Sequence, residues 1–167
     1  MEIRTRQFGF MEIDEKQVYT MPCGMPGFRN MKRFAFIERK EIWPFICFQS
    51  LDDADLSFYI MNPALFMPDY RLDMDTAIRE AGWEGDGAED VSLYVIVNTS
   101  AGVPEKITAN LIGPLVLNAR RREADQLVLH NSPYTHQHLI FSQSSSAKMT
   151  KPPRKRVEDS GHQAVSA

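Results

Sequence analysis

Short strand-like segments recur along most of this chain, and they constrain its fold more than any other feature. They are rich in aromatic and β-branched residues, are bounded by turn formers, and return roughly every eight to twelve residues. Such spacing with few helices favours a mainly β fold, a sandwich or a small antiparallel barrel. A parallel α/β fold would need alternating helices, which this sequence lacks. The strands are predicted at residues 2–7, 9–13, 16–21, 34–37, 44–50, 56–62, 91–97, 107–112, 115–119 and 126–130.

One segment, residues 75–82, has the pattern of a helix. Asp73 or Asp75 can cap its first turn, and Gly82 can end it. We therefore expect one or two short helices beside the barrel-like domain.

Composition indicates a single domain over residues 1–141. The chain has 167 residues, of which 43% are hydrophobic, enough for a sizeable core. No apolar run approaches the eighteen or so residues that span a bilayer, and no signal peptide is evident at the N-terminus. Cys23 and Cys47 are too few for a disulfide scaffold and too far apart for a CxxC motif. We therefore expect a cytoplasmic protein that needs neither membrane nor cofactor, with Cys47 buried and Cys23 exposed.

Residues 142–167 differ from the rest, because they are mostly polar and contain the basic cluster 151–156. Such a segment buries too little apolar area to offset the entropy of ordering, so we predict a disordered tail. Its basic cluster leaves open an alternative function, a small nucleic-acid-binding barrel that uses the tail. A plain solubilising end is the simpler interpretation.

Charge is unevenly distributed. Residues 1–141 carry 14 Lys and Arg against 20 Asp and Glu, whereas residues 142–167 carry five against two. Residues 51–90 hold eleven acids and only two arginines. A negative surface of this kind repels nucleic acid and attracts a basic protein, although it can also serve solubility alone.

Motifs of catalysis are missing from the sequence. Residues 24–27 are not followed by the Gly-Lys-Ser/Thr of a phosphate-binding loop, and no GxGxxG or GxSxG pattern occurs. His136 and His138 have a spacing that can bind metal, but no third ligand is fixed nearby, so we interpret them as ordinary exposed histidines. The chain is therefore predicted not to be an enzyme.

Residues 108–118 form an apolar stretch that is chemically inert, with Gly113-Pro114 as a hinge between two extended segments. Proline cannot donate to a sheet ladder, so Pro114 marks an edge, a bulge or a strand start. Asn110 and Asn118 are expected to pair with the backbone. This stretch is interpreted as scaffold.

Four segments together resemble the flagellar assembly factor FliW family. They are residues 21–28, 44–50, 62–70 and 108–118, and their order and spacing match across roughly residues 1–141. Two features depart from the family pattern. Residues 120–125 replace its Gly-containing turn before Gln126, and the tail after Ser142 lies outside it.

The resemblance implies a small, barrel-like, non-enzymatic cytoplasmic protein of bacteria. Proteins of this kind bind flagellin and also bind CsrA, a translational repressor, and thereby relieve its block on flagellin messenger RNA. Flagellin competes for the factor, so unsecreted flagellin shuts off its own synthesis. We expect a monomer with these two partners and no direct contact with nucleic acid.

Contacts with the two partners are expected between residues 45 and 70. Apolar side chains there suit an amphipathic helix, and carboxylates suit a basic protein. The alternative for each aromatic residue is core packing, because strand alternation buries about half of them. The predicted contact residues are Phe45, Phe48, Asp52, Asp53, Asp55, Leu56, Phe58, Phe66, Asp69 and Tyr70.

Overall fold

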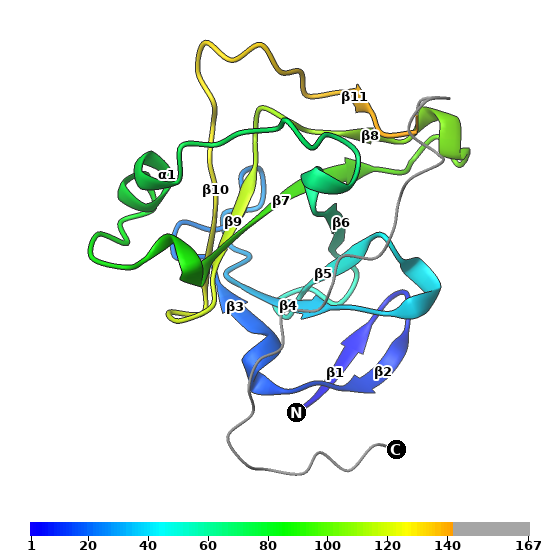
Figure 1. Cartoon of the computed structure of the whole chain (residues 1–167). Coiled ribbons are helices and arrows are strands. Elements are labelled where there is room, and N and C mark those ends of the chain that lie inside the picture. Colours follow the sequence, from blue (N-terminus) through cyan, green and yellow to red (C-terminus); the bar gives the residue numbers. More distant parts are fainter. Residues whose placement is uncertain (142–167) are drawn as a thin grey trace.

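A closed β-barrel of seven strands forms the body of the protein in the computed structural model, which describes residues 1–141 (Figure 1). Around the barrel the strands follow the order β7-β6-β5-β4-β3-β10-β9, and β9 pairs with β7 to close the ring. The barrel strands are β3 (Val18–Thr20), β4 (Arg33–Ile37), β5 (Ile46–Ser50), β6 (Ser57–Met61), β7 (Val91–Asn98), β9 (Leu115–Asn118) and β10 (Glu123–Gln126). The predicted mainly β barrel is thus confirmed.

The barrel is mixed and not purely antiparallel, as β10 runs parallel to β3 with Glu123 opposite Thr20. The other six neighbouring pairs are antiparallel. Strand direction cannot alternate around a ring with an odd number of members, so one parallel pair is a geometric necessity.

Two small elements extend or cover the barrel. Strand β7 also pairs with β8 (Thr108–Ala109), which in turn pairs with β11 (His138–Leu139). A separate hairpin of β1 (Glu2–Thr5) and β2 (Gly9–Glu12) lies at the lower side of Figure 1. Short 3-10 turns join the strands: η1 (Glu15–Gln17), η2 (Lys40–Ile42), η3 (Pro63–Leu65), η4 (Ala88–Asp90) and η5 (Pro104–Lys106). Within residues 1–141, every helix is too short or too polar to cross a bilayer.

Aromatic side chains fill the barrel interior. Phe36, Phe48 and Phe58 lie directly opposite one another on β4, β5 and β6. Phe34 stacks on Phe48 with ring centroids 4.7 Å apart, and burial raises the pKa of Tyr94 in the same core to about 12. Because side chains alternate along a strand, the residues between these aromatics face outward.

The outer face of the barrel is covered by the hairpin at β4 and β5 and by a helix at β9. Ala35, Ile37 and Cys47 pack under the hairpin, and burial raises the pKa of the Cys47 thiol to about 11. Cys47 is buried and Cys23 is exposed, as predicted. The helix α1 (Met74–Glu80) packs over Val116 and Leu127 on the far side of the barrel wall.

Local signals predicted some elements well. Asp73 caps α1 by accepting hydrogen bonds from the N–H groups of Asp75 and Thr76. The hairpin at Gly9 is also confirmed, with φ of +67°. The strand predicted at residues 126–130 was wrong, because β10 ends at Gln126. The predicted tail, residues 142–167, lies outside the described residues.

Pro114 explains that early end. Gln126 pairs with Leu115, and the next position on β9 would need the N–H that proline lacks. Leu127 and Leu129 nevertheless stay extended, and their N–H groups donate to the carbonyls of Pro114 and Ile112 at 2.9 and 2.8 Å. The ladder therefore continues with hydrogen bonds in one direction only.

Residues 108–118 form a corner of the barrel held by two asparagines, as expected for scaffold. Asn110 Oδ1 accepts hydrogen bonds from the N–H groups of Ile112 and Gly113. Asn118, fully buried, accepts from the N–H groups of Arg120 and Arg121 at 3.0 Å each and donates to Asp86. These side chains fix the two turns that flank β9.

Replacing Asn118 tests this role. We expect Asn118→Ala to lower the free energy of unfolding by about 2–3 kcal/mol, because buried groups lose three hydrogen bonds. Urea denaturation followed by circular dichroism measures the loss. Asn98→Ala is the control, since exposed Asn98 accepts only the Ser100 N–H, and its cost should stay below about 1 kcal/mol. Equal losses at the two positions would contradict the scaffold role of Asn118.

The pH dependence of stability offers a second test at this corner. Hydrogen bonds from Arg121 and then Asn118 hold the pKa of Asp86 below its usual range. A depressed folded pKa means that Asp86 stabilises the fold above its unfolded pKa of about 4, and that this contribution is lost as the pH falls further. Asp86→Asn should therefore flatten the decline of unfolding free energy between about pH 4 and pH 2. An unchanged acid decline would contradict this.

Candidate partner-binding surface

The loop between β5 and β6, residues 51–56, carries three of the predicted aspartates, and we call it the aspartate loop. Ser50 Oγ accepts hydrogen bonds from the N–H groups of Asp52 and Asp53 at 3.1 and 3.0 Å. Asp53 Oδ1 accepts from the Asp55 N–H at 2.9 Å. The chain then returns to β6 through a bond from the Leu56 N–H to the Asp53 carbonyl. These bonds give the loop one defined conformation.

Gln49 supports the loop from beneath. Its side chain is fully buried, and Nε2 donates to the carbonyls of Ser50, Ala54 and Leu56 at 3.0, 3.1 and 3.0 Å. The carbonyls of Ala54 and Leu56 also accept the backbone N–H groups of Arg6 and Ser50 at 3.0 and 2.9 Å, so the buried amide adds a side-chain support to the backbone hydrogen bonds of the loop.

The three aspartates of the loop differ in their contacts. Asp52 Oδ2 accepts hydrogen bonds from the backbone N–H groups of Lys32 and Arg33 at 2.7 and 3.0 Å. Burial acts to raise the pKa of Asp52, but these two bonds and the Arg33 charge outweigh it and hold that pKa below its usual range. Asp52 therefore ties two loops together. Asp53 and Asp55 are exposed and form no ion pair within residues 1–141, so their charges face solvent.

An aromatic pair lies beside the aspartate loop. Phe28 is 44% exposed, and its ring contacts Phe58 edge-on with centroids 5.8 Å apart. The Phe28 N–H donates to the Met25 carbonyl at 2.7 Å. The turn requires Gly24, which has φ of +71° and whose Cβ would lie 2.3 Å from the Arg29 carbonyl oxygen.

Phe28 thus joins the predicted residues on one patch. Met31 and Lys32, which follow it, contact Ser50 and Asp52, so the loop that carries Phe28 borders the aspartate loop. We define the aspartate-loop surface as Phe28, Asp53, Asp55, Leu56 and Phe58. Sequence reasoning missed Phe28, although its proline- and glycine-rich loop was one of the four motifs.

The other predicted contact residues lie elsewhere. Phe48 is fully buried in the barrel interior. Tyr70 is 5% exposed and donates its hydroxyl hydrogen to the Leu111 carbonyl at 2.8 Å. Phe45 and Phe66 are half-buried in the same cluster as Tyr70, where Phe66 stacks on His138. Asp69 is exposed just before Tyr70. The structure therefore brings together Asp53, Asp55, Leu56 and Phe58, but not the whole set.

The described part of the chain has no cluster of side chains that could bind a metal ion. Across residues 1–141, no three or more His, Cys, Asp and Glu side chains gather in a way that could hold an ion. The aspartate-loop surface offers negative charge and apolar area.

Gln49 gives a test of how the loop is held. We expect Gln49→Ala to lower the free energy of unfolding by about 2–4 kcal/mol and to speed amide exchange at Asp53 and Asp55, since the loop loses the hydrogen bonds of a fully buried amide and a cavity is left beneath it. Exposed Gln137→Ala is the matched control. Unchanged exchange in the loop would show that Gln49 does not hold it.

Comparison with known proteins identifies the family. The sequence model described as "FliW protein" matches residues 2–140. The flagellar assembly factor FliW of Bacillus pumilus is 37% identical over 145 residues, covering 87% of this chain and 99% of that protein. The Bacillus subtilis factor is 36% identical over 144 residues, covering 86% and 99%. A crystal structure of the flagellar assembly factor FliW aligns with a TM-score of 0.74 at 32% identity, over 86% of this chain and 99% of that one. The chain therefore belongs to the FliW family, which comprises non-enzymatic flagellar assembly factors.

Proposed function

We propose that this protein regulates flagellin synthesis by switching between two partners, flagellin and the translational repressor CsrA. The observation that supports the proposal is the aspartate-loop surface, where two carboxylates without an ion pair within residues 1–141 accompany a partly exposed aromatic pair. One side of this patch suits a basic protein, and the other suits an apolar one.

Electrostatics favours a basic RNA-binding partner. Residues 1–141 carry 14 basic against 20 acidic side chains, so the body has a net negative charge that attracts cations at long range. Asp53 and Asp55 then act at short range, because neither is neutralised by a neighbour within residues 1–141. Bound to CsrA, such a surface would disfavour RNA phosphate nearby and so relieve repression.

Apolar area on the same surface favours flagellin. Phe28 and Phe58 are partly exposed, and Leu56 lies two positions before Phe58 in the chain. Terminal helices of an unassembled filament protein have apolar faces that need cover, and a groove or patch of aromatic side chains provides it. Phe45, Phe66 and Asp69 remain in the proposal as a second contact region. Phe48 and Tyr70 are left out because they lie in the core.

Switching sets a limit on the two affinities. A difference of about 1.4 kcal/mol is a tenfold preference, so a gap of several kcal/mol would hold the protein on one partner. Partners that share Leu56 and its neighbours would exclude each other without any change of shape.

Competition between purified proteins tests the proposal. The full chain should retain flagellin and CsrA of the same organism in separate pull-down assays, and added flagellin should release bound CsrA. Retention of neither partner would refute the proposed function.

A charge reversal tests the electrostatic part. Asp53→Lys with Asp55→Lys should weaken CsrA binding roughly tenfold or more at low salt and much less at high salt, because salt screens exposed charges. Isothermal titration calorimetry at two salt concentrations measures this. The control is Glu2→Lys with Glu105→Lys, which changes net charge equally at exposed sites elsewhere. Equal losses in the two double variants would assign the effect to net charge alone.

A paired aromatic substitution tests the apolar part. Phe28→Ser should weaken flagellin binding by about ten- to a hundredfold, the cost of a lost buried aromatic side chain. Phe10→Ser is the control, since Phe10 is 71% exposed on the hairpin and is not one of the residues of the aspartate-loop surface. Unchanged binding by Phe28→Ser would remove this patch from the flagellin site.

A further inference from the structure

A groove of about 460 Å³ lies between α1 and residues 127–134. We call it the α1 groove. Its apolar lining comes from both walls: Leu72 and Ala77 from the helix side, and Leu127, Leu129 and Tyr134 from the strand side. Nothing among residues 1–141 fills it.

The strand side of the α1 groove is an unpaired edge. Leu127 and Leu129 direct their N–H groups to the carbonyls of Pro114 and Ile112, so the alternate residues Val128 and His130 face the other way. Within residues 1–141, neither of these two N–H groups reaches a hydrogen-bond acceptor. Val128 is also 58% exposed. A ligand with free carbonyls and apolar area would satisfy both features.

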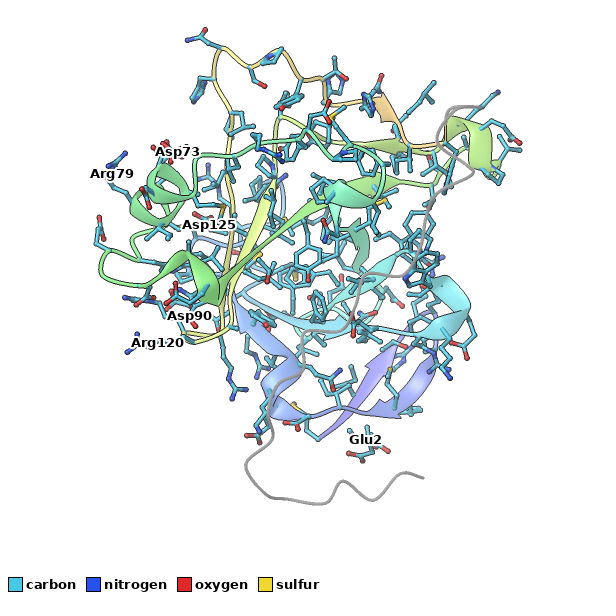
Figure 2. The ribbon with its side chains drawn as sticks, in the orientation of Figure 1. Glu2, Asp73, Arg79, Asp90, Arg120 and Asp125 are labelled. Atoms are coloured by element: carbon cyan, nitrogen blue, oxygen red, sulfur yellow. The ribbon has the colours of Figure 1, made fainter. Side chains whose placement is uncertain are left out.

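The helix side is negatively charged. Asp73 and Glu80 line the α1 groove, and neither forms an ion pair within residues 1–141. Figure 2 shows Asp73 on α1 and Asp125 on the strand side. Burial, and then the charge of Glu80, raise the pKa of Asp125. Arg71 also lines the groove and keeps its positive charge while it donates to the carbonyls of Pro68 and Tyr70, so Asp73, Glu80 and Arg71 together leave one net negative charge.

We propose that the α1 groove binds the basic segment of the same chain, residues 151–156, Lys-Pro-Pro-Arg-Lys-Arg. This segment has four positive charges and no negative one, which complements Asp73 and Glu80. Proline removes the N–H donor but keeps the carbonyl acceptor, which matches an edge that offers N–H groups. Consecutive prolines also favour the extended polyproline conformation, whose rings pack on aromatic side chains such as Tyr134.

The length of the chain permits this contact. Phe141, the last described residue, packs in the cluster that contains Leu129 and Tyr134, two residues of the groove lining. Nine residues lie between Phe141 and Lys151, and the ten steps from one to the other span up to roughly 33–36 Å. A domain of this size is roughly 35–40 Å across, so the connecting residues are long enough to span most of it and to bring Lys151 to the groove.

Occupancy of the groove would withdraw four positive charges from solution and cover acidic area on the body. If the proposed function holds, the segment would thereby compete with a basic partner for the same negative field. The docking itself does not depend on that function, and the following test uses no partner.

Backbone amide spectra of the full chain test the docking. The variant Lys151→Ser, Arg154→Ser, Lys155→Ser, Arg156→Ser should shift the amide signals of residues 127–134 and 76–80, with the Val128 and His130 N–H groups among the largest changes. Shifts confined to the substituted segment, or centred on the aspartate loop, would overturn the proposal. Shifts that depend on protein concentration would assign the groove to a second copy of the chain and would also overturn it.

A substitution in the groove provides the reciprocal measurement. Glu80→Lys in the full chain should move the signals of residues 151–156 toward those of a free peptide of the same sequence. Glu84→Lys makes the same change of charge at an exposed position outside the groove lining and should leave them in place. A peptide of residues 148–158 added to the fourfold variant should bind at least fivefold more weakly after Glu80→Lys. Equal effects of the two lysine variants would reduce the contact to non-specific attraction.

Discussion

Closure of the barrel depends on β7, which is long enough to pair with different strands along its length. Its first half, Val91 to Tyr94, pairs with β9, and its second half pairs with β6 and then with β8. A closed ring leaves no free barrel edge, so the remaining elements need only cover the outer faces. The hairpin covers β4 and β5, and α1 covers β9 and Leu127, the residue that follows β10.

Because the barrel has an odd number of strands, it contains one parallel pair, β3 with β10, which we call the parallel seam. Glu123 lies opposite Thr20 across this seam, and its carboxylate also accepts a hydrogen bond from the buried Trp83 indole at 2.7 Å. The seam has only one registered residue pair, fewer than any antiparallel contact of the barrel. Side-chain hydrogen bonds around β10 therefore supplement its short backbone ladder. Asn118 and Arg121, both bonded to Asp86, hold the adjoining turn.

Sequence reasoning succeeded where the deciding interactions are local. The cap at Asp73 and the turn at Gly9 depend on residues within a few positions, and both were predicted. The end of β10 depends on Pro114, twelve residues before Gln126, and was missed. The parallel seam follows from a strand count that no local pattern contains. Long-range pairing thus sets the limit of what the pattern of residues could predict.

The same limit applies to the contact residues. Strand alternation indicates that half the aromatic residues face inward, but it does not say which half. Phe48 and Phe58 both face the barrel interior, yet only Phe58 is partly exposed and contacts Phe28. Asp52 and Asp53 are neighbours, yet Asp52 accepts a hydrogen bond from the backbone N–H of Lys32, twenty positions away. No spacing rule distinguishes a structural aspartate from a free one.

The aspartate-loop surface and the α1 groove belong to different parts of the chain, but both carry acidic side chains. The described body has six more acidic than basic side chains, from 20 acidic and 14 basic, whereas residues 142–167 have three more basic, from five basic and two acidic. Long-range steering of a basic partner follows the summed field, while contact at the aspartate loop follows only charges within a screening length of about 10 Å at 0.1 M salt. A basic segment held in the α1 groove would therefore slow the approach of such a partner more than it weakens the final contact. Partner choice could then be tuned through the association rate while Asp53 and Asp55 stay free to bind.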